Sequence, residues 1–297
     1  MAEFRHKVTR VRSRRSLAGS LAGACVALAA LPGLVGAGPA LADITAAADV
    51  GYPPFAMTKS DGSFEGIDID IAKALSEEMG ATIKVIDQPW SATIPGLKAG
   101  KFDMILAPAT ITEERAQSLL FAEGYGDATF SFLLPAGGPD VKTLDDLRGK
   151  VVATNKGNLF DRWLSEREKQ YGWKITRFDK HSDAAAAVAA GQADAAIMYT
   201  ASVGWLAKTK PVFKPSAYIV DNKEYFGYAF RLDQAETRNK VDAALECLKK
   251  SGKIGAIFKK WTGIEPLPNG MTATVVAGYG PEGFPNHDKT EHAGACK

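Results

Sequence analysis

Apolar and polar positions along residues 43–262 alternate between the period of a strand and that of a helix. Residues 69–79 place apolar side chains at helical spacing, with Asp68 as the expected N-cap and Gly80 as the expected stop. Such alternation favours an α/β fold with parallel-rich sheets flanked by helices. Strands are predicted over 83–86, 102–107, 130–134, 151–154, 174–178, 193–198, 225–230 and 271–276. Helices are predicted over 91–99, 143–147, 159–169 and an alanine-rich segment ending at Gly191, and residues 235–260 are predicted to form two helices around Ser251 and Gly252.

Residues 1–42 have the pattern of an export signal. Six basic residues precede a long apolar stretch, and Ala40, Leu41 and Ala42 form the small-residue pattern of a cleavage site. We expect cleavage near Ala42, export to the periplasm by the Sec or the Tat route, and no stable membrane insertion afterwards.

The charge of the chain after residue 42 argues against a strongly charged partner. This part keeps 30 of the 36 Lys and Arg and 33 of the 34 Asp and Glu, so its net charge is −3, against +2 for the whole sequence. A near-neutral chain offers no electrostatic footprint for nucleic acid or an anionic membrane. No nucleotide, nucleophile or metal motif appears in its required context, so we expect no cofactor and no metal.

The chain after residue 42 is long enough for two modest hydrophobic cores, since about 255 residues remain. The segments 130–134 and 225–230 are interpreted as strands that cross between two lobes, and the apolar positions of 235–260 would dock back on the first lobe. The predicted first lobe is therefore discontinuous. It comprises 43–129 and 223–263, the second lobe comprises 130–222, and residues 264–297 form a Pro- and Gly-rich tail that we expect to be partly ordered.

Two cysteines follow residue 42, Cys247 and Cys296. An oxidising compartment would let them pair and tie the tail to a helix. Closing that loop would contribute about 4 kcal/mol in the chain-entropy model. Two unpaired thiols are the alternative, because spacing alone does not fix the geometry.

The junction at residues 107–115, where a buried strand enters a helix, is the strongest candidate for binding chemistry. Thr112 is the expected N-cap, which puts Arg115 in the first turn, where the helix dipole disfavours a cation. The guanidinium, backbone N–H groups and the hydroxyls of Thr110 and Thr112 would together hold a carboxylate. The alternative is an Arg115 that pairs with a neighbouring glutamate at the surface.

A second strand-to-helix loop, residues 154–158, would face the first across the lobes. Its glycine permits close backbone approach, and Asn158 lies at the start of the following helix, so both loops could hold one anion. Tyr52, in a rigid turn after Asp49, offers an aromatic wall for a ligand, or else packs in the core.

Several segments of the chain, taken in the order in which they occur, resemble the bacterial extracellular solute-binding family that includes the polar amino-acid receptors of ABC importers. The resemblance spans roughly Thr45 to Gly263. It rests on residues 49–55, 66–70, 89–90, 94–97, 100–103, 110–115, 144–150, 191–195, 226–230 and 257–261.

The resemblance implies a type II periplasmic-binding-protein fold, whose two lobes are joined by two crossing strands and close on the ligand like a hinged clamp. Arg115 would hold an α-carboxylate together with Thr112 and N–H groups near Asn158, and Tyr52 would stack on the ligand. It also implies a monomer that delivers its ligand to an ABC importer permease in the inner membrane, without catalysis.

Three residues depart from the family pattern. Tyr199 stands where amino-acid receptors carry an acid for the α-ammonium group, and a neutral phenol cannot replace that ion pair. Ile67 replaces the second aromatic wall, and Pro108 removes an N–H group. We therefore expect a small carboxylate-bearing ligand: an organic acid, a modified amino acid, or an amino acid whose cation meets Asp49 or Glu224.

Two alternatives come from other functional classes. The same fold resembles cyclohexadienyl dehydratases, for which Glu224 or Asp49 would serve as the general acid. The chain would otherwise be an accessory binding module for a periplasmic dehydrogenase or a sensor, with the tail contacting the partner.

Overall fold

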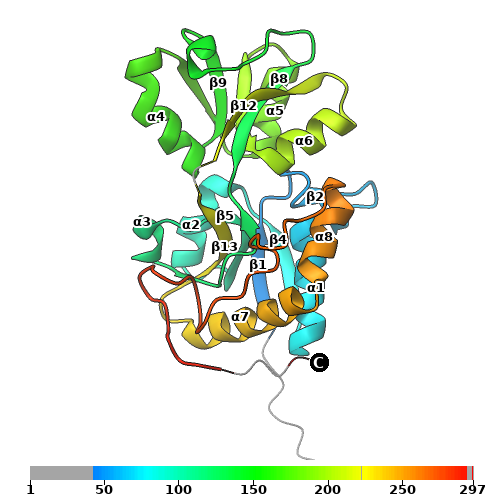
Figure 1. Cartoon of the computed structure of the whole chain (residues 1–297), viewed down its shortest axis with the longest axis vertical. Coiled ribbons are helices and arrows are strands. Elements are labelled where there is room, and N and C mark those ends of the chain that lie inside the picture. The colour runs from blue at the N-terminus through cyan, green and yellow to red at the C-terminus, as the bar shows by residue number, and fades with distance from the viewer. Residues whose placement is uncertain (1–42, 222, 293–295, 297) are drawn as a thin grey trace, which may run out of the picture. The chain divides into compact units, whose positions relative to one another are not determined.

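The computed structural model of the protein describes residues 43–292 except 222, together with Cys296 (Figure 1). The predicted export segment, residues 1–42, lies outside the described residues. Within the described part of the chain, no helix combines the length and the apolar character needed to cross a membrane.

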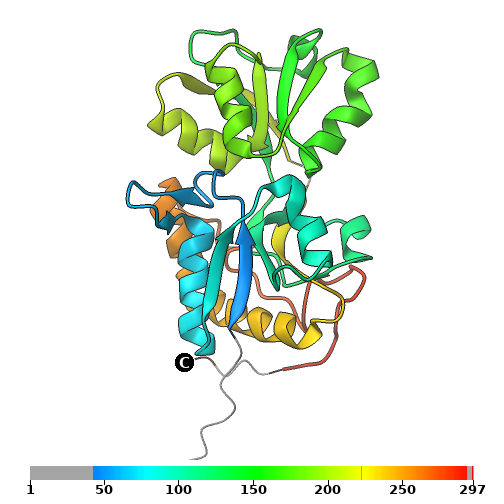
Figure 2. The same ribbon diagram turned by 180° about the vertical axis from the view of Figure 1, so that it is seen from behind.

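The first of two large sheets is built from both ends of the described chain (Figures 1 and 2). Its strands run parallel where β1 pairs with β4 and β5, and antiparallel where β13 pairs with β5 and β6. The order is β4 (Ile83–Asp87), β1 (Ile44–Ala48), β5 (Met104–Thr110), β13 (Tyr225–Phe230) and β6 (Leu120–Phe121), with β7 (Gly126–Asp127) also paired to β13. The helices of this part are α1 (Ile67–Met79), α2 (Trp90–Lys98), α3 (Glu113–Ala116), α7 (Ala235–Lys250) and α8 (Lys253–Thr262), beside a small hairpin of β2 (Met57–Thr58) and β3 (Phe64–Glu65).

The second sheet lies wholly within residues 130–220. Its strand order is β10 (Lys174–Phe178), β9 (Val151–Asn155), β11 (Ala195–Tyr199), β8 (Phe130–Pro135) and β12 (Phe213–Val220), with β8 antiparallel to both β11 and β12. Its helices are η1 (Leu144–Leu147), α4 (Leu159–Tyr171), α5 (His181–Ala189) and α6 (Thr200–Thr209). We call residues 43–129 and 223–263 the first lobe and residues 130–222 the second lobe.

Helix α1 begins two residues earlier than predicted, and Asp68 is not its N-cap. Gly66 precedes the helix with a φ of 134°, and a Cβ there would lie 2.3 Å from the carbonyl oxygen of Phe55. Asp68 is fully buried and accepts hydrogen bonds from the hydroxyls of Tyr125 (2.6 Å) and Tyr228 (2.9 Å). The carboxylate therefore ties α1 to the sheet instead of capping the helix.

Other secondary-structure predictions were incomplete or wrong. They missed β1, α6, β12 and the two-residue strands β2, β3, β6 and β7. The strand predicted over 271–276 is absent, although its β-branched residues favour one. There the backbone meets charged side chains: Lys249 donates to the carbonyl of Thr274 (2.7 Å), and the N–H of Val276 donates to Glu123 (2.9 Å).

The tail is packed against the first lobe, which corrects the expectation of partial order for its described residues. Helix α7 buries charged residues on the face that the tail covers, and Lys249 pairs with Glu123 at 2.9 Å with both side chains at most 2% exposed. Asp242 accepts from the N–H of Gly280 (2.5 Å), and Arg238 donates to the carbonyl of Tyr279 (3.2 Å). Because buried charges are costly without partners, the tail is an integral part of this lobe.

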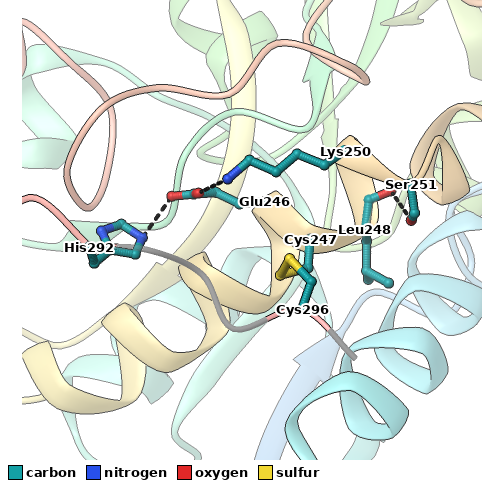
Figure 3. The surroundings of a disulfide bond; sticks show 7 residues. All are labelled: Glu246, Cys247, Leu248, Lys250, Ser251, His292 and Cys296. Atoms are coloured by element: carbon teal, nitrogen blue, oxygen red, sulfur yellow. Dashed lines mark hydrogen bonds and ion pairs between the residues drawn. A yellow bond between two sulfur atoms is a disulfide. The ribbon is translucent and has the colours of Figure 1, made fainter.

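The end of the tail is joined to α7 by a disulfide between Cys247 and Cys296 (Figure 3). The residue before Cys247, Glu246, pairs with His292 of the tail at 2.8 Å and with Lys250 at 3.0 Å. The amide of Asn286 donates to the carbonyl of Ala116 in α3 (2.6 Å), so the tail also supports the turn that carries Arg115.

Candidate functional site

A small cavity between the two lobes, here called the inner cavity, brings together most of the predicted site residues. It leaves about 20 Å³ for the centres of water-sized molecules. One water needs roughly 10–15 Å³ by that measure, so the cavity is almost filled by the protein itself. Its lining includes Asp49, Tyr52, Phe55, Trp90, Thr110, Arg115, Asn158, Phe160, His181 and Tyr199.

Tyr199 is the side chain that crosses this cavity. Its hydroxyl, at the end of β11 in the second lobe, bonds to the carbonyl of Pro108 (2.9 Å) and to the hydroxyl of Thr110, both on β5 of the first lobe. The N–H of Tyr199 donates to the hydroxyl of Tyr52 (3.1 Å). Burial raises the pKa of Tyr199 to about 12, so the phenol is neutral. Hydrogen bonds of the protein therefore bridge the lobes here.

Aromatic rings surround Tyr199 and account for the small free space. Tyr52 stacks on His181 with ring centroids 3.5 Å apart, and Phe160 packs edge-on against Tyr199 at 4.9 Å. Burial lowers the pKa of His181 to about 3, which makes this imidazole neutral. Tyr52 thus lies at the cavity as predicted, but its stacking partner is a residue of the chain.

Arg115 reaches the cavity from α3, which is a single turn. Thr112 caps this turn as predicted, with its hydroxyl accepting from the N–H of Arg115 at 3.2 Å. The guanidinium donates to the carbonyl of Thr110 (2.9 Å) and lies over the ring of Trp90, 5.5 Å from its centroid. Since both threonine hydroxyls already have partners, the arginine itself is the main anion-binding group of this loop.

Four residues that line the inner cavity have a buried polar atom without a well-formed hydrogen bond. These are Asp49 (both carboxylate oxygens), Asp68 (Oδ2), Asn158 (Nδ2) and His181 (Nδ1). The backbone N–H groups of His181 and Trp90 still favour the charged form of Asp49. Burial raises the pKa of Asp49 to about 7, and the charge of Lys180 partly offsets this. Unpaired buried polar groups carry a free-energy cost, so their gathering at one cavity is typical of a site that receives a ligand.

Three predicted site residues are not among those lining the inner cavity: Thr112, which caps α3, Ile67 and Glu224. Ile67 is fully buried in the core of the first lobe and is not among the residues lining the cavity. Glu224 is half-buried at the start of β13, where burial raises its pKa and the charges of Arg162 and Arg115 lower it. Sequence reasoning missed His181, although it too begins a helix after a strand.

A second, larger space adjoins Arg115 and is here called the outer pocket. It measures about 370 Å³ and shares Arg115, Asn158 and Leu159 with the inner cavity. Its other charged residues come from both lobes: Lys98 and Glu114 from the first, and Asp161, Arg162 and Arg177 from the second. Glu114 pairs with Arg162 across the lobes, and Arg177 pairs with Asp161 at 2.7 Å.

Comparison with known proteins shows the family of this chain. The family model of the bacterial extracellular solute-binding proteins, family 3, matches residues 44–264. The L-arginine-binding protein of Pseudomonas aeruginosa is 32% identical over 222 residues, which covers 72% of this chain and 85% of that protein.

Solved structures give the same result. An ancestral arginine-binding protein bound to arginine matches with a TM-score of 0.69 and 29% identity, over 74% of this chain and 97% of that one. The ancestral amino acid-binding protein AncCDT-1, a precursor of cyclohexadienyl dehydratase, matches with a TM-score of 0.65 and 28% identity, over 74% and 95% of the two chains. The chain therefore belongs to the bacterial extracellular solute-binding proteins, family 3, and has their type II periplasmic-binding-protein fold.

Proposed function

We propose that this protein is a periplasmic solute-binding protein, which captures a small carboxylate-bearing ligand between its lobes and delivers it to an ABC importer permease. The observation that carries the proposal is Arg115. Among the described residues it has no ion-pair partner within 4.0 Å, yet it lines both spaces between the lobes. A guanidinium held in this way is suited to bind a carboxylate.

The ligand of this site need not carry an α-ammonium group. Two of the relatives named above bind arginine. Here, however, the neutral phenol of Tyr199 lies where the resemblance expects an acid, and its hydroxyl already bonds to Pro108 and Thr110. Asp49 lines the same cavity and its oxygens lack a well-formed hydrogen bond, so it is the carboxylate that a cationic group of the ligand would meet there. The proposed ligands are therefore organic acids, modified amino acids, or an amino acid whose cation meets Asp49.

Calorimetric titration tests the proposal. The exported protein, purified from the periplasm, is titrated with a panel of amino acids, their des-amino analogues and other organic acids. We expect selective binding that Arg115→Ala weakens at least ~30-fold, since a hydrogen-bonded charge contributes about 2 kcal/mol. Arg148→Ala is the control, because Arg148 is exposed and pairs with Asp145 away from the site. Tight binding of standard L-amino acids but not of their des-amino analogues would contradict the proposed ligand class.

One observation favours an enzymatic alternative. A carboxyl with a pKa of about 7 in an enclosed cavity, such as Asp49, is suited to act as a general acid. The likeness to a precursor of cyclohexadienyl dehydratase agrees with that reading. Release of carbon dioxide and water from prephenate or arogenate, lost in Asp49→Asn but retained in Glu224→Gln, would establish it.

A further inference from the structure

We propose that the outer pocket is a second anion-binding subsite, and that the solute is a small dicarboxylate with one carboxylate at Arg115 and the other at Lys98. This inference rests on the proposed function, because it adds a second anchor to the solute that Arg115 holds. The two spaces that adjoin Arg115 differ greatly in volume.

The available room favours the outer side of Arg115. The inner cavity has space for about one water, whereas the outer pocket measures about 370 Å³. Sites for small molecules are typically roughly 300–1,000 Å³. A solute bound with the lobes as they stand therefore extends outwards, past α3 and the start of α4.

The charges of the outer pocket match a dianion. Four cations and two anions line it, and the two anions are already engaged, Glu114 with Arg162 and Asp161 with Arg177. Lys98 and Arg115 are the cations of this lining that have no carboxylate within 4.0 Å in the described part of the chain. The pocket thus has a net charge of +2 at the positions where a dicarboxylate would place its two ends.

Ser118 links the ammonium group of Lys98 to the backbone of Arg115. Ser118 accepts a hydrogen bond from the ammonium group of Lys98 (3.1 Å) and donates to the backbone carbonyl of Arg115 (3.4 Å). Lys98 lies in the last turn of α2, so both cations belong to the first lobe. This arrangement limits how far Lys98 can move from Arg115, which is what recognition of a ligand of fixed length requires.

An uncharged donor completes the subsite from the second lobe. The side-chain oxygen of Asn158 accepts from the N–H of Asp161 (2.8 Å) and caps α4, while its Nδ2 has no partner, although the residue is only 7% exposed. Asn158 lines both spaces, next to Arg115. A carboxylate at Arg115 would accept from this amide and benefit from the N-terminus of the 13-residue helix α4.

Titration of matched acids tests the inference. The exported protein is titrated with butanoate and butanedioate and with pentanoate and pentanedioate. We expect the dicarboxylates to bind at least tenfold more tightly than the monocarboxylates of equal length, and the difference to shrink as salt is raised. Lys98→Gln should remove most of the difference while it leaves monocarboxylate affinity within twofold.

Control variants separate the two proposals. Lys101→Gln removes another exposed lysine of the first lobe that does not line the pocket, and should change nothing. Ser118→Ala should reduce the preference for dicarboxylates without removing it. Equal affinity for both kinds of acid, or equal effects of Lys98→Gln and Lys101→Gln, would overturn the second subsite and leave the proposed function intact. Failure of every carboxylate to bind would overturn both.

Discussion

The inner cavity and the outer pocket share Arg115 and Asn158 but differ in what surrounds those two residues. The inner cavity is filled by aromatic rings from both lobes, and its unpaired polar groups face about 20 Å³ of space. The outer pocket is lined by charges and measures about 370 Å³. The difference teaches that the chain's own side chains close the inner side of Arg115, while its outer side keeps the room for a ligand.

Tyr199 lines the inner cavity but not the outer pocket, and it accounts for much of the difference between them. Its hydroxyl and its N–H make hydrogen bonds between the two lobes. A ligand shifts the equilibrium between open and closed lobes only by the difference in its affinity for the two forms. Bonds supplied by the chain itself therefore favour the closed form before any ligand arrives.

The largest predicted effect comes from Tyr199→Ala. Removing a buried aromatic side chain should lower the free energy of unfolding by about 3–5 kcal/mol, because it leaves a cavity and breaks contacts between the lobes. The same cavity should let bulky monocarboxylates bind on the inner side. Urea denaturation measures the first effect and calorimetry the second.

Tyr199→Phe is the matched variant, since it keeps the ring and removes only the hydroxyl. Its stability should fall by about 1 kcal/mol, with no gain in affinity for bulky acids. If Tyr199→Ala binds none of these acids more tightly than the wild type, the ring is not what fills the inner side.

An intermediate effect is expected from pH, through Asp49. Burial raises its pKa from 3.8 to about 7, so the folded protein holds this proton more tightly than the unfolded chain. The protonated carboxyl of Asp49 therefore adds to the free energy of unfolding. This contribution is fully present below pH 3.8 and is lost as the pH rises through about 7. Between pH 5 and pH 8 the loss amounts to about 2–3 kcal/mol.

The variant Asp49→Asn isolates this contribution, because Asp68 and Glu123 are buried carboxyls with pKa values near 7 that change stability in the same direction. The variant should match the wild type at pH 5 and exceed it at pH 8 in free energy of unfolding. Parallel curves for the two proteins would mean that Asp49 is not the buried acid described above.

Sequence patterns predicted much of the fold but only some of the residues that distinguish the inner cavity from the outer pocket. The strands at 174–178 and 225–230 have the predicted bounds, because β-branched and aromatic residues between clear punctuation favour one structure. The reach of Tyr199 to Thr110, 89 positions away, has no local signal. Proximity of Lys98 to Arg115 likewise depends on how α2 and α3 pack, and sequence spacing does not reveal it.

The order of the tail, residues 264–297 as far as they are described, is a second feature that local sequence patterns did not predict. Its Pro- and Gly-rich composition is typical of partial order, and a local pattern gave no reason to expect otherwise. Its partners are the buried charges of α7, among them Arg238 and Asp242, which look like an exposed polar face when α7 is considered alone. Pairing between distant polar residues decides the structure here.

The smallest predicted effect concerns the rim of the outer pocket. Glu114 of the first lobe pairs with Arg162 of the second, and both side chains are partly exposed. Exposed pairs of this kind contribute about 0.2–1 kcal/mol, so their loss costs little. Glu114→Gln removes one of the two anions of the pocket and leaves Arg162 with only its longer contact to Glu166 (3.8 Å). Affinity for dicarboxylates should therefore rise about two- to fivefold.

The control for this rim variant is Glu113→Gln, at an exposed neighbour that does not line the pocket. It removes the same charge from the same turn, so it carries the same change in the long-range field at Arg115. A gain in Glu114→Gln alone places the second carboxylate in the outer pocket, whereas equal gains would mean that only net charge matters. Loss of affinity in Glu114→Gln would show that the pair's main role is to hold the lobes together around the ligand.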